Sequence, residues 1–592
     1  MTSRSSLERF VPRVASEWDL EAKGRLHREI DGTLCFVDIS GFTKLSEKLA
    51  RRGRIGAEEL TDVLDRVFGE MLRLAYDRGG SLLKFGGDAL LLMFEGDDHP
   101  LQGVSAAIEM RAALRQATKI PTSVGRIALR MSVGLHTGPI DLYRVGDSHR
   151  EVIITGDVAT TTTDMEAAAD ANEILISPDL ARALPHDAAG EPKGPGVLLR
   201  WRKAPVAAVG PHHRAAVGAD VIEGCLPTVL RQNLIGGIAE PEHRVATVGF
   251  VKFKGIGQAM ADGGPDHVAD NLDELVRSVQ QAVDSEGVTF LASDIDADGG
   301  KIILTTGAPV TQEDDEGRML RAVRQIADAG TALPLRIGVN RGHVFAGEIG
   351  TPFRSTYTVM GDTVNLAARL MAAAPAGGVY VAPTVLDRSR TLFDATPLEP
   401  FRVKGKAEPV QAYAIGPERG MRTAEVGHGL PFRGRDGERE RIRQAVGEIG
   451  SGSRSMTVVG ETGMGKSRLV EEALRDVEAS VFRIQGEATG ADNPYWATRD
   501  PVRSLLGIAR RSQEEMAAQL RQEVEQRAPA LLPLLPLLGD VTHIDIEETP
   551  ETAAIDPRFR PDRTADAFAQ LLRSIFDGPL VVVAEDRHWL DD

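Results

Sequence analysis

The stretch FVDISGFTKLSEKL, residues 36–49, decides the fold of the first half of this chain. It begins as an apolar strand that ends at Asp38, and the residues after the strand have helical period. Downstream, LLKFGGDALLLMF, residues 82–94, predicts a β-hairpin whose glycine turn carries Asp88. A strand, a helix and a hairpin in this order predict an α+β domain with helices packed on one sheet.

This set of elements occurs twice. GLHTG at Gly134 recurs as GVNRG at Gly338, about 205 residues later, and Gly156-Asp157 recurs as Gly361-Asp362 at nearly the same spacing. FVDISGF is matched by FVKFKGI, which starts at Phe250. The sequence therefore predicts two related α+β domains in tandem.

Composition limits the class of partner. The chain has 592 residues and a net charge of −17, which argues against nucleic acid or an anionic membrane as a partner. The two cysteines are too few for a disulfide framework, and no apolar stretch approaches the length of a membrane helix. The N-terminus lacks the apolar core of a signal peptide, so we expect a cytoplasmic protein.

The first copy carries a pattern suited to a metal and a phosphate. Asp38 ends a strand just before the turn at Gly41, where a helix N-terminus offers backbone N–H groups to a phosphate. Asp88 would face Asp38 if the hairpin pairs beside the first strand, and two carboxylates suit divalent cations. Taken singly, each aspartate is equally a turn former or a helix cap.

These motifs together resemble the class III nucleotidyl cyclases, especially the soluble adenylyl cyclase type. The resemblance covers residues 31–416 and implies ferredoxin-like βαββαβ cores that pair head to tail, with the active site between them. It implies that ATP binds with two Mg²⁺ or Mn²⁺ ions. The implied metal and phosphate contacts of the first copy are Asp38, Asp88, the main chain of Ile39, Gly41, Phe42 and Thr43.

The second copy, in YTVMGDTVNLAARL, carries the complementary half. Asn365 and Arg369 are four residues apart, so they share one helix face, and the fork of an arginine suits a phosphoryl oxygen. By resemblance, Asn365 orients the ribose, Arg369 stabilises the negative charge that develops on the α-phosphate, and Thr358 contacts the base. Lys404 and Lys406 fit the family's triphosphate contact, and a solvated strand edge explains them equally well.

The two copies have lost opposite halves of this set. Lys252 stands in the slot of Asp38, while Thr160 and Asp164 occupy the slots of Asn365 and Arg369. One composite site and one degenerate site follow. In the degenerate site, Lys84 matches a bicarbonate-site lysine of the soluble enzymes, but Thr163 in the matching arginine slot argues against bicarbonate activation.

The substrate base is less well defined. Adenylyl members of the family place a lysine on the second hairpin to read adenine, and no lysine lies between Thr289 and Gly300. Asp294, Asp296 and Asp298 stand there instead, and an acid could accept hydrogen bonds from guanine. Guanylyl specificity stays open, while Thr358 favours ATP.

After residue 430 the pattern changes to alternating strands and helices, typical of an α/β domain. SMTVVGETGMGKSRL reads as a strand, a Walker A loop and a helix, and a strand ending in two acids resembles a Walker B. This resembles AAA/STAND ATPases that bind Mg-ATP, and either acid is a candidate for the Mg²⁺-facing carboxylate. The implied P-loop residues are Gly460, Gly463, Gly465, Lys466 and Ser467, with Glu585 and Asp586 as the acids.

The favoured interpretation is an adenylate cyclase that gives 3′,5′-cyclic AMP and pyrophosphate, with a regulatory ATP-binding module. The alternatives are a guanylate cyclase and a signalling ATPase whose cyclase pair senses nucleotides. Because residue 592 follows soon after the second acid, we expect a fragment of a longer protein with a further C-terminal region. The expected segments are a helical segment 1–30, cyclase domains 31–214 and 241–416, linkers 215–240 and 417–430, and a P-loop domain 431–592.

Overall fold

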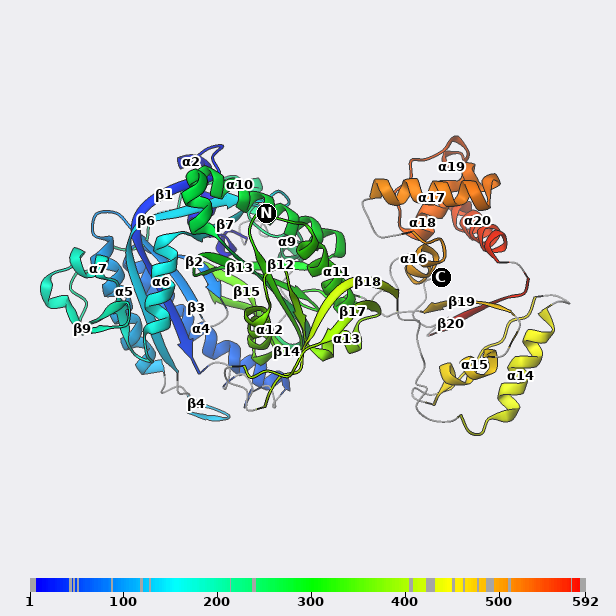
Figure 1. Cartoon of the computed structure of the whole chain (residues 1–592), viewed down its shortest axis with the longest axis horizontal. Coiled ribbons are helices and arrows are strands. Elements are labelled where there is room, and N and C mark those ends of the chain that lie inside the picture. Colours follow the sequence, from blue (N-terminus) through cyan, green and yellow to red (C-terminus); the bar gives the residue numbers. More distant parts are fainter. Residues whose placement is uncertain are drawn as a thin grey trace. The chain divides into compact units, whose positions relative to one another are not determined.

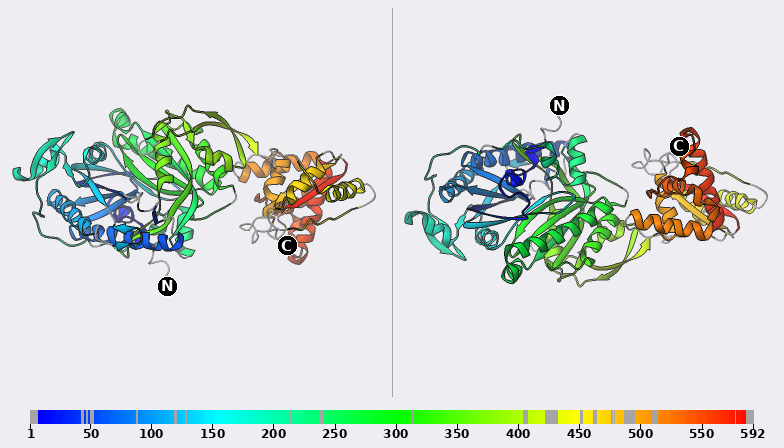
Figure 2. Two further views of the ribbon diagram at one scale, coloured as in Figure 1. Left: turned by 90° about the horizontal axis from the view of Figure 1, so that it is seen from below. Right: turned by 90° about the horizontal axis from the view of Figure 1, so that it is seen from above.

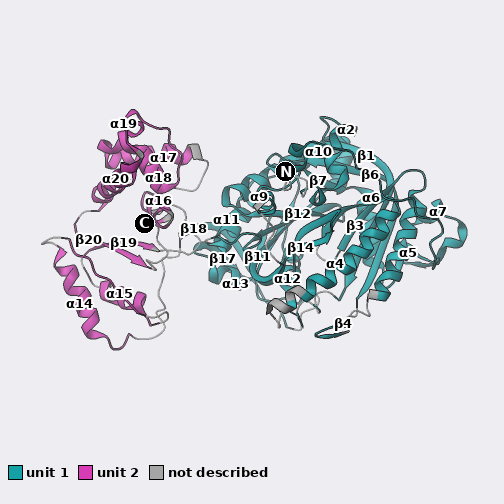
Figure 3. Cartoon of the chain, turned by 180° about the vertical axis from the view of Figure 1, so that it is seen from behind, with its two compact units in different colours: residues 1–421 teal, residues 422–592 magenta. Residues whose placement is uncertain are grey.

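The computed structural model places the chain in two compact units, residues 1–421 and 422–592 (Figure 3). The structure describes residues 7–585 apart from 42–44, 46–47, 50–52, 87–88, 118–120, 127–128, 213, 237–240, 313, 404–407, 422–431, 450–452, 461–463, 476, 478, 486–494, 509–512 and 577.

The first domain is built on an eight-stranded mixed sheet of order β2-β3-β1-β6-β8-β10-β9, with β7 paired to β6 (Figure 1). Its strands are β1 His27–Ser40, β2 Gly80–Gly86, β3 Ala89–Glu95, β6 Arg130–Val145, β7 Glu151–Thr155, β8 Ile174–Ile176, β9 Ala189–Lys193 and β10 Gly196–Leu199, with a separate small pair, β4 Pro121–Thr122 and β5 Gly125–Arg126. Its helices are α4 Gly53–Asp77, α5 His99–Ala117, α6 Asp157–Ala168, α7 Pro178–Ala183 and the 3₁₀ turn His186–Ala188.

The second domain repeats this topology, with order β12-β13-β11-β14-β16-β18-β17 and β15 paired to β14. The internal repeat and the α+β fold class are thereby confirmed. Its strands are β11 Glu242–Lys254, β12 Thr289–Asp296, β13 Gly299–Thr306, β14 Leu335–Thr351, β15 Arg354–Met360, β16 Val379–Val381, β17 Thr391–Pro397 and β18 Tyr413–Met421. Its helices are α10 Ile256–Glu286, α11 Asp315–Asp328, α12 Asp362–Ala373 and α13 Pro383–Arg388.

Strand β1 is apolar on both faces because both faces are buried. Cys35 and Val37 point into a core shared with α4 and α5, while Leu34 and Phe36 point into a core shared with the second domain. Successive side chains of a strand alternate between faces, so a continuous apolar run is what such a strand requires. Both views in Figure 2 show the two domains side by side.

Short helices close the same shared core. The N-terminal turns η1 Glu8–Phe10, α1 Arg13–Ser16 and α2 Trp18–Glu21 bury Trp18 completely. The segment that we expected to be a linker between the copies contains α8 Ala219–Glu223 and α9 Thr228–Gly236, and apolar residues of α9 join the shared core. The helix expected after Asp38 falls partly outside the described residues.

The second unit has a parallel strand pair, β19 Ser480–Gln485 and β20 Leu580–Glu585. We expected a strand immediately before the P-loop, but residues 453–460 have no regular secondary structure. The helices are α14 Asp436–Gly447, α15 Lys466–Leu474, α16 Trp496–Leu505, α17 Gln513–Arg527, α18 Leu535–Thr542, α19 Pro550–Ala553 and α20 Arg560–Ile575, with 3₁₀ turns Pro529–Leu534 and Pro557–Phe559. Within the described part of the chain, no helix is both long enough and apolar enough to cross a membrane.

Candidate functional site

Asp38 lies near the end of β1 and is half-buried. In the sheet it is the partner of Ala89, the residue directly after the Gly87–Asp88 turn. This register brings the described ends of β2 and β3 beside the end of β1, so the hairpin pairs with the first strand as predicted. Asp88 itself lies outside the described residues.

The turn after Asp38 is described only in part. Gly41 has φ 111°, a left-handed conformation that favours glycine, and this allows the chain to turn after β1. The predicted triphosphate contacts Phe42 and Thr43 lie outside the described residues, as do Lys404 and Lys406.

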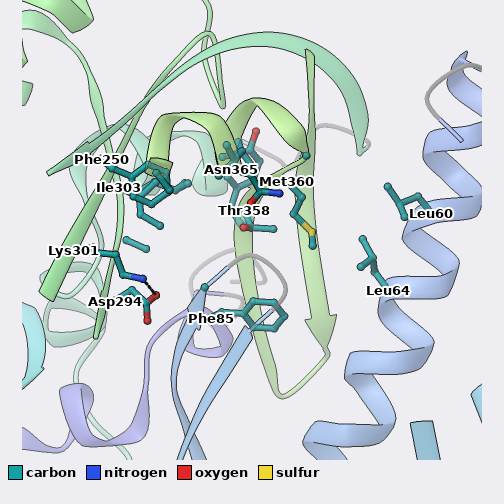
Figure 4. A pocket seen from close by; sticks show the side chains of 18 residues that line it. Leu60, Leu64, Phe85, Phe250, Asp294, Lys301, Ile303, Thr358, Met360 and Asn365 are labelled. Atoms are coloured by element: carbon teal, nitrogen blue, oxygen red, sulfur yellow. Dashed lines mark ion pairs between the residues drawn. The ribbon is translucent and has the colours of Figure 1, made fainter. Parts of the chain in front are cut away.

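A cavity of about 170 Å³ lies between the two domains (Figure 4). The first domain contributes the end of β2, with Phe85 and Gly86, and two leucines of α4. The second domain contributes its hairpin, β15 and the first turns of α12. The lining residues are Leu60, Leu64, Phe85, Gly86, Phe250, Leu291, Ala292, Asp294, Lys301, Ile303, Tyr357, Thr358, Val359, Met360, Gly361, Val364, Asn365 and Ala368.

Two of the predicted contacts of the second domain line this cavity. Thr358 is buried on β15, and Asn365 lies in the first turn of α12, which begins after Gly361. Gly361 has φ 134°, so a residue with a side chain would be strained at this junction. Both side chains therefore reach the cavity because the strand and the helix meet at this glycine.

Arg369 lies one turn further along α12 and does not line the cavity. Its Nη1 atom is buried and has no hydrogen-bond partner in the described part of the chain. A buried donor without a partner is costly. An anionic ligand that accepted from this atom would remove that cost.

The cavity also contains an ion pair that the sequence prediction missed. Lys301 Nζ on β13 lies 3.2 Å from Asp294 Oδ2 on β12 (Figure 4). Burial lowers the pKa of Lys301, but the charges of Asp294, Asp296 and Asp38 outweigh this, so the pKa is raised and the ammonium stays charged. Lys301 directly follows Gly300, just outside the stretch from Thr289 to Gly300 that contains no lysine, and the strand pairing places it in the cavity.

The three acids of the second hairpin have separate surroundings. Asp296 pairs with Lys252 at 2.7 Å. Asp298 accepts hydrogen bonds from the main-chain N–H groups of Gly255 and Gly257. Asp294 alone of the three lines the cavity, so it is the acid that a bound base would meet.

The residues predicted for the degenerate site lie at a second boundary between the domains, here called the second cleft, and they make direct contacts across it. Lys84 donates to Glu151 and, at 2.7 Å, to Ser293 of the second domain. Thr160 accepts from the main chain of Asp298 at 3.0 Å, and Asp164 is exposed. These contacts join the two domains directly.

Glu151 is ionised in this second cleft. Burial raises its pKa, but the charges of Lys84 and His149 outweigh burial and hold the pKa well below its ordinary value. The side chains of Lys84 and Glu151 are 10% and 11% exposed, so this is a buried ion pair. The ammonium of Lys84 therefore already has a carboxylate partner from its own chain.

Two predicted metal contacts, Asp38 and Ile39, lie near the end of β1. Asp38 supplies a carboxylate and Ile39 a main-chain carbonyl, and Mg²⁺ prefers such oxygen ligands. Among the described residues, no group of three or more His, Cys, Asp or Glu side chains is arranged to hold a metal ion.

The P-loop of the second unit is described at its two ends. Helix α15 starts at Lys466 after Gly465, whose φ is 76°, and Lys466 Nζ donates to the main-chain oxygen of Gly460 at 2.9 Å. Ser467 lies in the first turn of α15, and Gly463 lies outside the described residues. The loop thus ends at a helix N-terminus, as a phosphate site requires.

The pair of predicted Walker B acids is also described only in part. Glu585 ends β20 and lies opposite Gln485 of β19. Arg483 Nη1 lies 3.5 Å from Glu585 Oε1. Asp586 lies outside the described residues.

Comparison with known proteins identifies both parts of the chain. The model of the adenylate and guanylate cyclase catalytic domain matches residues 27–195 and 242–416, and an AAA ATPase domain model matches residues 431–592. Adenylate cyclase type 10 of Oryctolagus cuniculus is 24% identical over 506 residues, which cover 75% of this chain and 30% of that protein. The chain thus spans less than a third of that relative's length.

Two further matches are more distant or shorter. An adenylate cyclase of Mycobacterium tuberculosis is 27% identical over 212 residues, covering 33% of this chain and 47% of that protein. The structure of a class III adenylyl cyclase-like ATP-binding protein from Pseudomonas aeruginosa has 14% identity and a TM-score of 0.42, covering 61% of this chain and 85% of that one. Since the cyclase match takes up more than half of the sequence, the chain belongs to the adenylate and guanylate cyclase catalytic domain family, with two such domains in tandem followed by an AAA ATPase domain.

Proposed function

We propose that the chain is an adenylate cyclase with one composite site between its tandem domains. The observation that carries the proposal is the cavity where the first domain's hairpin end, beside Asp38, meets Thr358 and Asn365 of the second domain. The two curated relatives described above are named adenylate cyclases. The opposite losses in the two copies also support a single working site.

In the proposed reaction, the ribose 3′-hydroxyl oxygen attacks the α-phosphorus of ATP. The bond from that phosphorus to the pyrophosphate oxygen breaks, and the hydroxyl proton passes to solvent. Two Mg²⁺ or Mn²⁺ ions at Asp38, Asp88 and the Ile39 carbonyl would lower the pKa of the hydroxyl and neutralise phosphate charge. Asn365 positions the ribose, and Arg369 donates to the α-phosphate oxygens, whose charge grows in the transition state.

The test is cyclic nucleotide formation by the full chain with ATP or GTP and Mg²⁺ or Mn²⁺. We expect Asp38→Ala and Arg369→Ala each to lower the rate about 100-fold or more, because each removes a charge that acts on the phosphates. Asp164→Ala is the matched control, since Asp164 occupies the slot of Arg369 on α6 and is exposed. If the unaltered chain formed no more cyclic nucleotide than Asp38→Ala and Arg369→Ala, with either nucleotide and either metal, the proposal would be overturned.

For the second unit, we propose a regulatory module that binds Mg-ATP. The placement of Lys466 over the loop at Gly460, at the start of α15, supports phosphate binding there. The same observation favours a second candidate function, a signalling ATPase whose cyclase pair senses nucleotides. Three results together would favour that second candidate. The unaltered chain would form no cyclic product, Lys466→Ala would lose the release of phosphate from ATP, and Asp38→Ala would keep it.

A further inference from the structure

A second cavity, of about 330 Å³, lies at the other end of strand β2. The strand begins here with Gly80 and Ser81, and it ends with Phe85 and Gly86 at the cavity of the proposed composite site. Small-molecule sites usually have volumes of about 300–1,000 Å³, so this cavity is large enough for a small ligand. We call it the arginine pocket, and its described lining residues are Arg13, Arg73, Tyr76, Asp77, Gly80, Ser81, Pro211, His212, Arg214 and Phe353.

Two aromatic rings line the arginine pocket, one from each domain. Tyr76 lies in the last turn of α4 and Phe353 in the turn between β14 and β15, and their ring centroids are 5.0 Å apart. The Tyr76 hydroxyl accepts from the main-chain N–H of Leu82 at 3.3 Å, which fixes its ring. Phe353 is 45% exposed. The two rings therefore offer contact to a flat apolar group, which prefers to pack against aromatic side chains.

The same pocket is lined by three arginines and, among its described lining residues, by one carboxylate, Asp77. Arg73 donates to Asp77 at 2.8 Å, and Arg214 donates to the main-chain oxygen of Glu8 at 2.8 Å. Arg13 is likewise paired with acids of its own domain. Such bonds hold a guanidinium in place before a ligand arrives, which lowers the entropic cost of binding.

A buried positive charge beside the pocket has no carboxylate partner among the described residues. Arg354 is 5% exposed, its Nη1 atom donates to main-chain oxygens that include that of Arg9 at 3.0 Å, and its Nε atom is buried without a hydrogen-bond partner there. Burial lowers the pKa of Arg354 to about 10, so the group stays charged at pH 7. Tyr76 and Arg214, whose charges act on it, both line the pocket. An anion in the pocket would offset this costly buried charge.

We propose that the arginine pocket binds a small aromatic carboxylate. The ring of the ligand packs against Tyr76 and Phe353, and its carboxylate faces the arginines. One negative charge matches the one charge, on Arg354, that has no carboxylate partner in the described part of the chain. The proposal goes beyond the proposed function and does not depend on it, because no residue of the arginine pocket lines the composite cavity.

The first test varies the ligand. Binding of 2-naphthoate, benzoate, 2-naphthalenemethanol and acetate to the full chain is measured by isothermal titration calorimetry. We expect 2-naphthoate to bind about tenfold or more tightly than 2-naphthalenemethanol, which has the ring without the charge, because hydrogen bonds to charged groups are the stronger ones. Acetate, which has the charge without the ring, should also bind more weakly. Equal binding of the alcohol, or no saturable binding of either aromatic acid, would overturn the proposal.

The second test places the ligand with surface variants. Phe353→Ser and Arg73→Gln each remove one exposed side chain of the pocket, and each should weaken 2-naphthoate binding about fivefold or more. Phe559→Ser and Arg182→Gln are the matched controls, because Phe559 is also an exposed aromatic side chain and Arg182 also forms an exposed pair with an acid three residues away. Affinity that survives in both pocket variants would show that 2-naphthoate binds elsewhere and would overturn the proposal.

The third test addresses the buried charge. In Arg354→Met, folding is first checked by urea unfolding, and the folded variant should show a smaller preference for 2-naphthoate over 2-naphthalenemethanol. An undiminished preference in folded Arg354→Met would contradict the role of this charge, and the two surface variants decide the proposal if Arg354→Met does not fold. Cyclic nucleotide is not measured in any of these tests, so the binding proposal and the proposed function fail separately.

Discussion

Single residues distinguish the two clefts of the cyclase pair. Each cleft holds a lysine against a carboxylate, Lys301 with Asp294 in one and Lys84 with Glu151 in the other. The first pair lines a cavity between the domains. In the second pair, Lys84 donates to Ser293 of the second domain and Glu151 accepts from the same hydroxyl, so both members contact the neighbouring domain.

Glu151→Gln should therefore destabilise the chain. The substitution leaves the buried ammonium of Lys84 without its charged partner, and removing one member of a buried pair costs about 3–5 kcal/mol in the free energy of unfolding. The free energy is measured by urea unfolding at pH 7. Asp170→Asn, at an exposed pair with Lys193, is the control and should leave the midpoint unchanged.

The stability difference between the unaltered chain and Glu151→Gln should decrease at acidic pH. Because the pKa of Glu151 in the folded chain is lowered, its stabilisation is complete above the ordinary value of 4.5 and is lost as the pH falls toward the folded pKa. The charged and polar groups that face it are Lys84, His149 and Ser293. The difference in free energy of unfolding between the unaltered chain and Glu151→Gln should begin to shrink below about pH 4.5. A difference that does not change with pH would contradict the stabilising role of ionised Glu151.

Thr358 and Asn365 line the cavity, and both could be named from the sequence because each lies within a contiguous motif. Lys301 could not, because its place in the cavity depends on which residues of two strands are opposite each other. Periodicity shows which face of a strand a residue occupies, but not the length of the hairpin that sets its level. The distinct surroundings of Asp294, Asp296 and Asp298 likewise depend on that register.

Secondary-structure elements were predicted well where they pair or pack within one domain. The two hairpins and the helices after the Gly-Asp turns follow from local pattern. The strand expected before the P-loop did not form, and Val459 there is 87% exposed. A strand needs a hydrogen-bonded neighbour and apolar packing, and neither is visible in the local sequence.

The contact between α12 and β14 offers a matched test at this scale. A Cβ at Gly338 would overlap the main chain at Ala367 and Met371, on the helix that carries Asn365 and Arg369. Gly338→Ala should cost about 3 kcal/mol and shift α12, so that the folded protein loses cyclase activity. Stability is measured by urea unfolding and activity as cyclic product per folded chain.

Gly134 is the same position of the first domain. A Cβ there would overlap the main chain of α6 near Thr162 and Glu166, and α6 carries no residue of the proposed composite site. Gly134→Ala should lose similar stability but keep more activity per folded chain. If Gly338→Ala and Gly134→Ala lost equal activity per folded chain, the placement of α12 would not be what determines cyclase activity.

At the scale of the whole molecule, both halves of the proposed site belong to one compact unit, residues 1–421. A mixture of Asp38→Ala and Arg369→Ala chains should therefore stay inactive at every ratio, because each chain pairs its own two domains. Cyclic product is measured in the mixture and in each variant alone. Recovery of a substantial fraction of the unaltered rate would show that domains pair between chains.

The direct contacts across the second cleft change how natural variation in this chain is to be interpreted. Because Lys84, Glu151 and Ser293 contact one another across the domain boundary, we expect a substitution there to act on folding and to be tolerated where another polar pair restores the contact. A substitution at Thr358 or Asn365 would act on the proposed site, and we expect no such compensation there. We expect duplication to place equivalent positions of the two domains under different constraints, one set for assembly of the domains and the other for chemistry.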